Sequence, residues 1–591
     1  MARQKILFIS HKKTQCGVYE FGKNITDVLR DSTRYDFIRV ECSSLAELKA
    51  AIELNQPAAI IYNYHPSVLP WVATKIVPRL YKNNLFSIEV PQIGIIHECT
   101  QGIADTASLR KTRLLLGRNS KLINSLFDFY ISSDPTLLLK NPIVYKTGRL
   151  VPRYHNNFPL PAKPIFGSFG FGTPNKGFED IVRLVQQEFD VGEIRFNIPA
   201  ADFGDQSGAA ARQIEDNCRQ ILTKPGINLV ITHDFFDAAG VFNFLARNTV
   251  NIFLYKDMAA RGVSSVIDSS LAAQRPIAIS DSTMFRHVLA ALPAICVKNN
   301  SLASIINNGF EPLQKFYDEW SPANLVWDYE RIVDAILLQA KSKNRPAAPI
   351  WLREAGPISE ADRNIDVSIK YDPIVLPPGA SLNRILDNSA RKLYAPTITK
   401  LQELAPKTMA KKIPEANVQQ AYVFDTVYRY LAEYDSPRVL CVGSYEDTAS
   451  LGLIKLGINV TEIDPTQNYS VQEYATKPSV VKNSYDIIFS TSVIEHDPDD
   501  ESFMRAIDNL LAPKGLAIIT CDYKEDWHPG EDKPEVDVRL YTKYDLEKRL
   551  LSYVPDCVLV DQPQWECPDP DFNYLGKYRY TFATFVIKKN K

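Results

Sequence analysis

The chain has 591 residues, of which 45% are hydrophobic and 23% are charged. Its 67 basic and 69 acidic residues give a formal net charge of -2, so no basic excess favours nucleic acid or a membrane surface as a partner. The chain is too long for one hydrophobic core, and we expect roughly three or four domains. The nine cysteines form no CxxC pair. The N-terminal segment lacks a long apolar stretch, and no run reaches the length of a membrane span. We therefore expect a reduced, cytoplasmic protein without an integral membrane segment.

The first 343 residues alternate between strand and helix patterns. Apolar β-rich runs predict strands at 4–10, 35–41, 57–66, 91–98, 165–171, 227–235, 249–255 and 275–280. Helical spacing predicts helices at 17–32, 178–189, 264–274 and 324–343, and in SLAELKAAIEL. A proline-rich connector at 153–164 separates two such series. This alternation predicts two parallel sheets covered on both faces, which we place at residues 1–155 and 156–343.

The rest of the chain predicts a third α/β domain. Residues 344–384 carry several prolines and read as a linker, and 385–433 look helical. Apolar strands follow at 438–443, 458–464, 485–496 and 510–523, and a final antiparallel strand is expected at 578–589. We therefore expect two Rossmann-like lobes followed by a third Rossmann-like domain at 385–591.

Two loops of the first half carry residues suited to an anion. Gly17 opens a helix directly after the first strand, and backbone N–H groups at such a position favour anions. In FGFGTPNKG (169–177), Gly172 lets the backbone approach a ligand and Lys176 supplies a point charge for phosphate. The alternatives are an ordinary turn between strand and helix at Gly17 and a Gly-Pro turn with a solvated lysine at 169–177.

A third loop, before the predicted helix at 264–274, is suited to a diphosphate. Arg261 and Gly262 come directly before Ser264 and Ser265, whose N–H groups and hydroxyls could hold the ligand. The alternative is a capping arrangement between Ser265 and Asp268, and both interpretations can hold together.

Over roughly residues 1–342 this layout resembles a GT-B glycosyltransferase of the family 4-like retaining type. The resemblance rests on RGVSSVIDSSLAAQRPIAIS, NKG, QCGVYEF and IIHE, which are similar to that family's donor segment, phosphate grip, glycine loop and strand-end histidine. It implies a nucleotide-sugar donor, retention of configuration and no metal, with Lys176 and Arg261 stabilising the leaving diphosphate. His97 would lie near the acceptor or donor sugar. The family's two glutamates fall on Arg261 and Ser269, with Asp268 beside the second, so donor identity and activity stay open.

The third domain carries the parts of an S-adenosylmethionine site. Gly443 supplies a close-approach turn, and Asp464, about 20 residues on, supplies a carboxylate for the ribose hydroxyls. Asp464 could instead be a helix N-cap. Ser444, Glu446 and Asp447 lie in the turn, where the two acids could accept from the cofactor's ammonium or could mark a domain that has lost the cofactor. Ser492 and Glu495 lie where a loop would cover the adenine or the methyl group.

Residues 385–591 resemble a class I methyltransferase of the small-molecule type, most specifically in SYDIIFSTSVIEHDPDD followed by LLAPKGLAIIT. Methyl transfer to a sugar hydroxyl needs a base within hydrogen-bond reach, and the candidates are His496, Asp522 and His528. The loop at 522–542, with Trp527 and Tyr541, has the character of an acceptor-binding insertion, although it could be a plain exposed loop.

These patterns predict a bifunctional enzyme of glycan synthesis. It would transfer a sugar from a nucleotide sugar to a saccharide or lipid-linked glycan, and it would O-methylate a sugar hydroxyl with S-adenosylmethionine. Two alternatives stay open: methyl transfer alone, with a degenerate GT-B module that binds the glycan, and sugar transfer alone, with a methyltransferase-like scaffold. We expect neither a metal nor nucleic acid, and the sequence leaves open whether the protein forms a homo-oligomer.

Overall fold

The computed structural model describes residues 3–12, 16–73, 88–107, 126–200, 205–258, 261–291, 293–298, 300–341, 362, 366 and 368–590. Contacts divide the chain into two compact units, residues 1–347 and 348–591. Much of the predicted linker at 344–384 lies outside the described residues, whereas residues 368–384 pack within the second unit. There Tyr371 donates a hydrogen bond to Asp425 at 2.6 Å. None of the helices in the described ranges is long and apolar enough to span a membrane.

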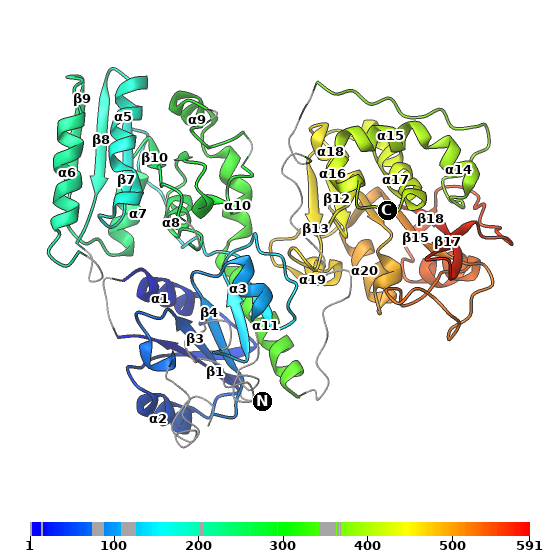
Figure 1. Ribbon diagram of the computed structural model, residues 1–591, viewed down its shortest axis with the longest axis horizontal. Helices are drawn as coiled ribbons and strands as arrows, with labels where there is room; N and C mark the ends of the chain where they lie inside the picture. Colours follow the sequence, from blue (N-terminus) through cyan, green and yellow to red (C-terminus); the bar gives the residue numbers. More distant parts are fainter. Residues whose placement is uncertain are drawn as a thin grey trace. The chain divides into compact units, whose positions relative to one another are not determined.

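The first unit contains two parallel sheets (Figure 1). The strand order of the first sheet is β2-β1-β3-β4-β5-β6. Its strands are β1 (Gln4–Ser10), β2 (Tyr35–Glu41), β3 (Ala59–Tyr64), β4 (Gln92–Ile96), β5 (Phe129–Ser132) and β6 (Val144–Lys146). Helices α1 (Gly17–Leu29), α2 (Leu45–Asn55), α3 (Gln101–Thr106) and α11 (Pro322–Lys341) surround it. The predicted strands and the helices at 17–32 and 324–343 are confirmed.

The second sheet has the order β11-β10-β7-β8-β9. Its strands are β7 (Ile165–Phe169), β8 (Gly192–Asn197), β9 (Ile227–Thr232), β10 (Val250–Phe253) and β11 (Ile277–Ile279). Alternate side chains of β10 enter two cores, since Ile252 packs under α5 (Phe178–Glu188) and α6 (Ala209–Ile221) while Phe253 packs under α7 (Ala238–Ala246) and α8 (Val266–Ala272). The sequence patterns missed β8 and α6, because β8 mixes charged residues into a short apolar alternation.

The second unit is built on a seven-stranded mixed sheet with the order β13-β12-β14-β15-β18-β16, in which β17 also pairs with β18. Its strands are β12 (Val439–Val442), β13 (Val460–Ile463), β14 (Tyr485–Thr491), β15 (Leu511–Tyr523), β16 (Cys557–Leu559), β17 (Phe572–Tyr574) and β18 (Tyr578–Lys589). As predicted, the last strand is antiparallel, pairing with β15 and β16.

Helices cover both faces of this mixed sheet. Ile487 and Phe489 of β14 face a core formed with α15 (Ala395–Leu404), α17 (Asn417–Tyr430) and α18 (Thr448–Lys455). Ile488, between them, faces α19 (Val471–Thr476) and α20 (Asp500–Leu510). The predicted α/β class with three Rossmann-like sheets is therefore confirmed. In each sheet the strand order reverses beside the first strand of its series, and such points are where α/β folds bind ligands.

Candidate functional sites

The first candidate site is a cleft at the carboxyl ends of the first two sheets. Two adjoining cavities there have volumes of about 400 and 350 Å³. Both are lined by the start of α1 and the loop before α8. The larger also contacts His97, Arg261 and Gly262, and the smaller contacts Lys176 and Asp268. The fold thus gathers predicted residues from three separate loops, as expected for a ligand cleft.

Helix α1 begins with its first turn open to the cleft. Its N-cap residue, Cys16, makes no side-chain capping bond. A Cβ on Gly17 would meet no atom within 4 Å, so the backbone here faces open space. Both residues line both cavities. No described side chain caps the first N–H groups of this 13-residue helix, and anion binding there stays a prediction.

His97 lies just beyond the end of β4 and is held by hydrogen bonding. Its Nε2 lies 2.7 Å from Oδ1 of Asn63. The Asn63 amide nitrogen donates to the Val18 carbonyl at 2.7 Å, so its oxygen accepts from the imidazole. Burial lowers the pKa of His97 to about 3, with smaller contributions from neighbouring His65 and Arg149. His97 is therefore a neutral imidazole in the larger cavity at physiological pH, and its catalytic role stays a prediction.

Lys176 projects into the smaller cavity from the loop after β7. Its Nζ lies 3.8 Å from the ring centroid of Tyr255, which follows β10. Burial, and next the charge of Arg261, lower the pKa of Lys176 to about 7. In the described part of the chain Lys176 makes no ion pair. An anion bound here would therefore interact with a lysine ammonium that has already lost part of its hydration.

The predicted role of Gly172 needs correction. A Cβ at this position would come within 2.7 Å of the Cα of Ala211, and Gly172 lines neither cavity. The glycine is required because the loop packs against the start of α6. Gly177 has a similar explanation, since its φ is +67° and a Cβ would lie 2.0 Å from the Leu254 carbonyl oxygen.

The loop before α8 is also built differently from the sequence hypothesis. The Ser264 N–H donates to the Met284 carbonyl at 2.9 Å, so it is already engaged. Ser265 is the N-cap of α8 but makes no side-chain capping bond, so the predicted Ser265–Asp268 arrangement is wrong. Asp268 is instead buried against Arg149, with Nε to Oδ1 at 3.0 Å and Nη2 to Oδ2 at 2.5 Å. Both side chains are withdrawn from water. The Arg149 guanidinium is therefore the main compensation for the charge of the Asp268 carboxylate.

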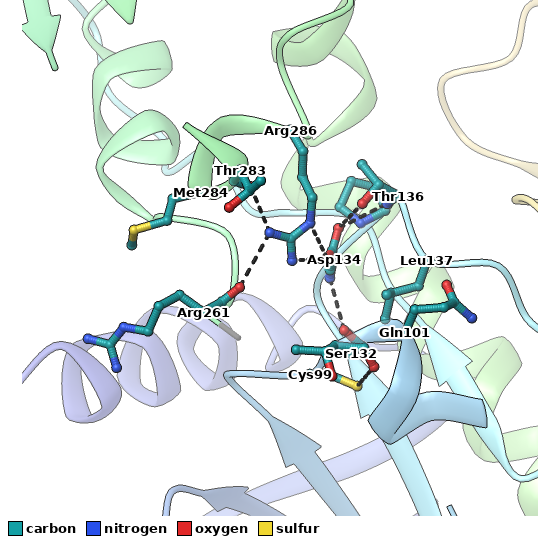
Figure 2. Close-up of polar contacts among 12 residues, drawn as sticks. Cys99, Gln101, Ser132, Asp134, Thr136, Leu137, Arg261, Thr283, Met284 and Arg286 are labelled. Atoms are coloured by element: carbon teal, nitrogen blue, oxygen red, sulfur yellow. Dashed lines mark hydrogen bonds and ion pairs between the residues drawn. The ribbon is translucent and has the colours of Figure 1, made fainter. Parts of the chain in front are cut away.

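Two further ion pairs join the lobes at the cleft. Arg261 pairs with Glu98, which follows His97. Arg286 pairs with Asp134 of the first lobe, with its Nε 3.0 Å from Oδ2, and also donates to the carbonyls of Arg261 and Thr283 (Figure 2). Gly262 lies beside these contacts, where a Cβ would be 2.1 Å from the His97 carbonyl oxygen. Glycine is therefore needed at 262 so that the two lobes can approach.

The second candidate site lies in the second unit, where β12 and β14 diverge. Gly443 follows β12 with φ +83°, and a Cβ there would lie 2.3 Å from Cγ2 of Val493. Its N–H donates to the Ile463 carbonyl at 2.8 Å. Ser444 is fully buried, and its Oγ has no hydrogen-bond partner within the described residues. A tight turn with an unsatisfied buried hydroxyl fits a bound polar ligand such as S-adenosylmethionine.

Asp464 lies at the adjacent strand end, as predicted. Its Oδ1 accepts from Thr466 N–H at 2.7 Å and its Oδ2 from Tyr445 N–H at 3.3 Å. The alternative of a helix N-cap is wrong, because α19 begins at Val471 and is capped by Ser470 in a capping box with Glu473. The backbone donors orient the carboxylate beside the Gly443 turn, where ribose hydroxyls could donate to it.

The two acids of the turn already have protein partners. Glu446 pairs with Lys411 at 2.6 Å. Asp447 caps α18 by accepting from Ser450 N–H at 2.6 Å, and it also accepts from Gln420 at 3.2 Å. Burial raises the pKa of Asp447. The predicted contact of these acids with the cofactor's ammonium stays a prediction.

Beyond β14 and β15 lies a buried acidic cluster, which we define as Glu495, Asp522 and Asp537. All three are at most 5% exposed. Ser492 donates to Glu495 at 2.6 Å, and His496 Nδ1 lies 3.1 Å from Asp537 Oδ1. Although burial lowers the pKa of His496, Asp537 and Glu495 outweigh it and raise the value to about 9. Desolvation raises the pKa of Glu495 and Asp522. Predicted residues 492, 495, 496 and 522 are thus adjacent, and Asp537 is a member that no motif indicated.

Other parts of the predicted acceptor loop lie elsewhere. His528 is exposed, whereas the cluster is buried. Trp527 and Tyr541 are 7% and 0% exposed, and the Tyr541 hydroxyl donates to Asp500 at 3.0 Å. The prediction that these rings offer faces to a sugar is therefore wrong for this state, because they belong to the core. No group of three or more potential metal ligands is arranged around a common point within the described ranges.

Comparison with known proteins places these sites in context. The family model described as "Methyltransferase domain" matches residues 440–519. A glycosyltransferase from Rickettsia africae is similar at 11% identity and TM-score 0.38, covering 57% of this chain and 99% of that one. Sucrose-phosphate synthase from Thermosynechococcus elongatus is similar at 16% identity and TM-score 0.34, covering 57% and 97%. No curated protein matches the chain.

The second unit has a similar solved structure of its own. It is the 1,6-didemethyltoxoflavin-N1-methyltransferase of Burkholderia thailandensis, with 14% identity and TM-score 0.22, covering 37% of this chain and 94% of that one. The family match shows a methyltransferase domain in the second unit, and the first unit consists of two parallel α/β lobes with a cleft at the carboxyl ends of their strands. The methyltransferase domain implies S-adenosylmethionine as the methyl donor.

Proposed function

We propose that this chain is a bifunctional enzyme of glycan synthesis. The first unit would transfer a sugar from a nucleotide sugar to a saccharide or lipid-linked glycan, and the second would methylate a sugar hydroxyl. The observation that carries this proposal is the family match over residues 440–519, because it encloses the Gly443 turn, Asp464 and Glu495 in one domain. This methyltransferase domain follows a two-lobed unit of the GT-B type in the same chain, and we therefore infer that both units act on the same glycan.

In the first unit, some cleft residues would bind the charged diphosphate, and others would orient the sugar. The open first turn of α1, Lys176 and Arg261 would bind the donor diphosphate, and they would stabilise it as it leaves. Neutral His97, held by Asn63, would hydrogen-bond a sugar hydroxyl. This division is supported by the lining of the two adjoining cavities: His97 and Arg261 line the larger, Lys176 lines the smaller, and the start of α1 lines both.

In the second unit, S-adenosylmethionine would supply the methyl group. Gly443 and Ser444 would let the backbone approach it, and Asp464 would accept hydrogen bonds from its ribose. The acidic cluster would receive the acceptor hydroxyl. His496 is an imidazolium at neutral pH because its pKa is about 9, so it cannot accept the hydroxyl proton; a carboxyl group of the cluster would do so only in its ionised form.

Calorimetry with S-adenosylhomocysteine and a panel of nucleotide sugars tests the proposal. We expect both ligand classes to bind, and Asp464→Ala to weaken cofactor binding by about 10- to 100-fold through loss of charge-assisted hydrogen bonds. Asp486→Ala, at the amino end of β14 and so at the opposite edge of the same sheet, is the control. Unchanged cofactor affinity in Asp464→Ala would reject the assigned site.

One observation favours a second candidate, methyl transfer with a glycan-binding GT-B module. Arg149, Arg261 and Arg286 are all paired with carboxylates, so the cleft holds few unengaged cations among the described residues. Release of nucleoside diphosphate that depends on an added acceptor would exclude this candidate.

A further inference from the structure

The ion pair between Glu98 and Arg261 differs from the other two pairs that join the lobes. Its side chains are 37% and 43% exposed, so solvent reaches both partners. Asp268 and Arg149 are 10% and 5% exposed, and Asp134 is 3% exposed. Exposed ion pairs contribute little net stability, whereas separating a buried pair is costly. Arg261 can therefore change partners while the buried pairs hold the lobes in place.

The main chain of Arg261 is fixed independently of its side chain. Arg286 donates to the Arg261 carbonyl at 3.4 Å and to the Thr283 carbonyl at 2.7 Å while it pairs with Asp134. Figure 2 shows the Arg261 side chain extending away from Arg286. Gly262 is also packed against the His97 carbonyl. A rotation of the guanidinium therefore needs no movement of the loop.

Arg261 lies at the boundary between the two cavities. It lines the larger one together with Glu98 and His65, whereas Ser264 and Ser265, a few residues on, line both. On the other side, its charge helps to lower the pKa of Lys176. Two cations that repel each other across this boundary would both be stabilised by one diphosphate between them.

Glu98 has a second neighbour on the opposite side of the pair. Its Oε2 lies 4.0 Å from Nε2 of His65, whose pKa is lowered by burial. Both side chains line the larger cavity, which also contains His97. A carboxylate beside neutral imidazoles is suited to accept a hydrogen bond from a sugar hydroxyl, and release of Arg261 frees its Oε1 as a further acceptor.

We propose that Glu98 gates the donor site: it holds Arg261 when no donor is bound, and it yields Arg261 to the donor diphosphate. The released carboxylate then accepts a hydrogen bond from the acceptor hydroxyl. Donor binding thereby prepares the acceptor site, and the two substrates bind in that order. This inference rests on the proposed sugar transfer, and it gives a role to Glu98, the residue after His97 in IIHE, to which the sequence analysis assigned none.

The test is a double-mutant cycle on binding of UDP, GDP, ADP and dTDP by calorimetry. Glu98→Gln should tighten diphosphate binding by about 2- to 5-fold, since it removes a competing exposed ion pair. Arg261→Gln should weaken binding, and Glu98→Gln should then have no further effect. Asp281→Asn, which removes an exposed carboxylate from Lys298 outside both cavities, is the control and should leave affinity unchanged.

The outcomes separate this proposal from the proposed function. Unchanged or weaker diphosphate binding in Glu98→Gln, with a normal melting temperature, would overturn the gating role while leaving sugar transfer intact. Absence of diphosphate binding in both the wild type and Glu98→Gln would overturn both. Binding only in Glu98→Gln would support the gate. In turnover, Glu98→Gln should raise the KM for the acceptor while lowering that for the donor, a split that a purely structural role would not produce.

Discussion

The cleft of the first unit and the acidic cluster of the second neutralise their charges in different ways. In the cleft, each of three arginines meets a carboxylate from the facing lobe: Arg149 with Asp268, Arg261 with Glu98 and Arg286 with Asp134. In the acidic cluster, three buried acidic side chains lie near one imidazolium, His496, and desolvation raises the pKa of Glu495 and of Asp522. The cleft thus balances its charges with ion pairs between the lobes, whereas the cluster combines one imidazolium with burial that favours the neutral form of two carboxyl groups.

The largest expected effect concerns the buried ion pairs of the cleft. Asp268→Asn leaves the Arg149 guanidinium buried without its counter-charge, so we expect the first unit to lose about 3 kcal/mol of stability. Differential scanning calorimetry would measure the shift, with Asp281→Asn as a control for an exposed pair. A loss as small as that of the control would show that this pair is not a fixed connection between the lobes.

A smaller loss is expected at the turn of the second unit. Gly443→Ala places a Cβ 2.3 Å from Val493 and imposes a φ of +83° on an L-residue, which we expect to cost about 2 kcal/mol and to abolish cofactor binding. Gly530→Ala is the matched control, because its φ is +100° but no atom lies within 4 Å. Denaturant unfolding would measure the loss of stability in both variants, and calorimetry with S-adenosylhomocysteine would measure the loss of cofactor affinity. The comparison separates backbone strain at positive φ from the steric clash with Val493. Equal behaviour of the two variants would refute the role of the close approach.

The pH dependence of stability should have opposite signs in the two units. In the first, burial lowers the pKa of Lys176 from 10.5 to about 7, so the unfolded state binds the proton more tightly and stability rises between these values. In the second, the pKa of His496 is raised from 6.5 to about 9, so its contribution is complete below pH 6.5 and is lost as pH rises to 9.

Variants isolate these two contributions. Lys176→Met should stabilise the first unit near pH 7, and its advantage should shrink as pH approaches 10.5. His496→Gln should destabilise the second unit near pH 6, and that deficit should shrink by pH 9. Melting curves of both variants against the wild type at several pH values would measure the differences, and differences that do not change with pH would contradict the charge assignments.

The smallest expected effect is on the titration of one histidine. Asp537→Asn removes the carboxylate that forms an ion pair with His496 at 3.1 Å, so the pKa of His496 should fall from about 9 toward 6.5 without unfolding the domain. The chain has eight histidines, few enough for their NMR titration curves to be assigned by substitution. An unchanged pKa would mean that Glu495 alone maintains the imidazolium.

Local patterns in the sequence were sufficient for the fold and for part of each site. Strand and helix periodicity predicted three parallel α/β series because buried strands and amphipathic helices leave direct composition signals. Gly443 and Asp464 were found because a turn and a strand-end carboxylate occur at a characteristic spacing in one βαβ unit. The same reasoning gave Gly172 a ligand contact, whereas the glycine is needed for packing against Ala211.

The sequence by itself determined the elements, their order and the loops that reach the carboxyl ends of the sheets. Only the tertiary structure decided which charges meet there. Arg149 and Asp268 are 119 positions apart, Arg286 and Asp134 are 152 apart, and Arg261 and Glu98 are 163 apart. No local pattern relates such residues, because their contact depends on how the two lobes pack against each other. The same is true of Asp537 and Trp527, whose burial in a polar loop follows from the packing of that loop and not from its composition.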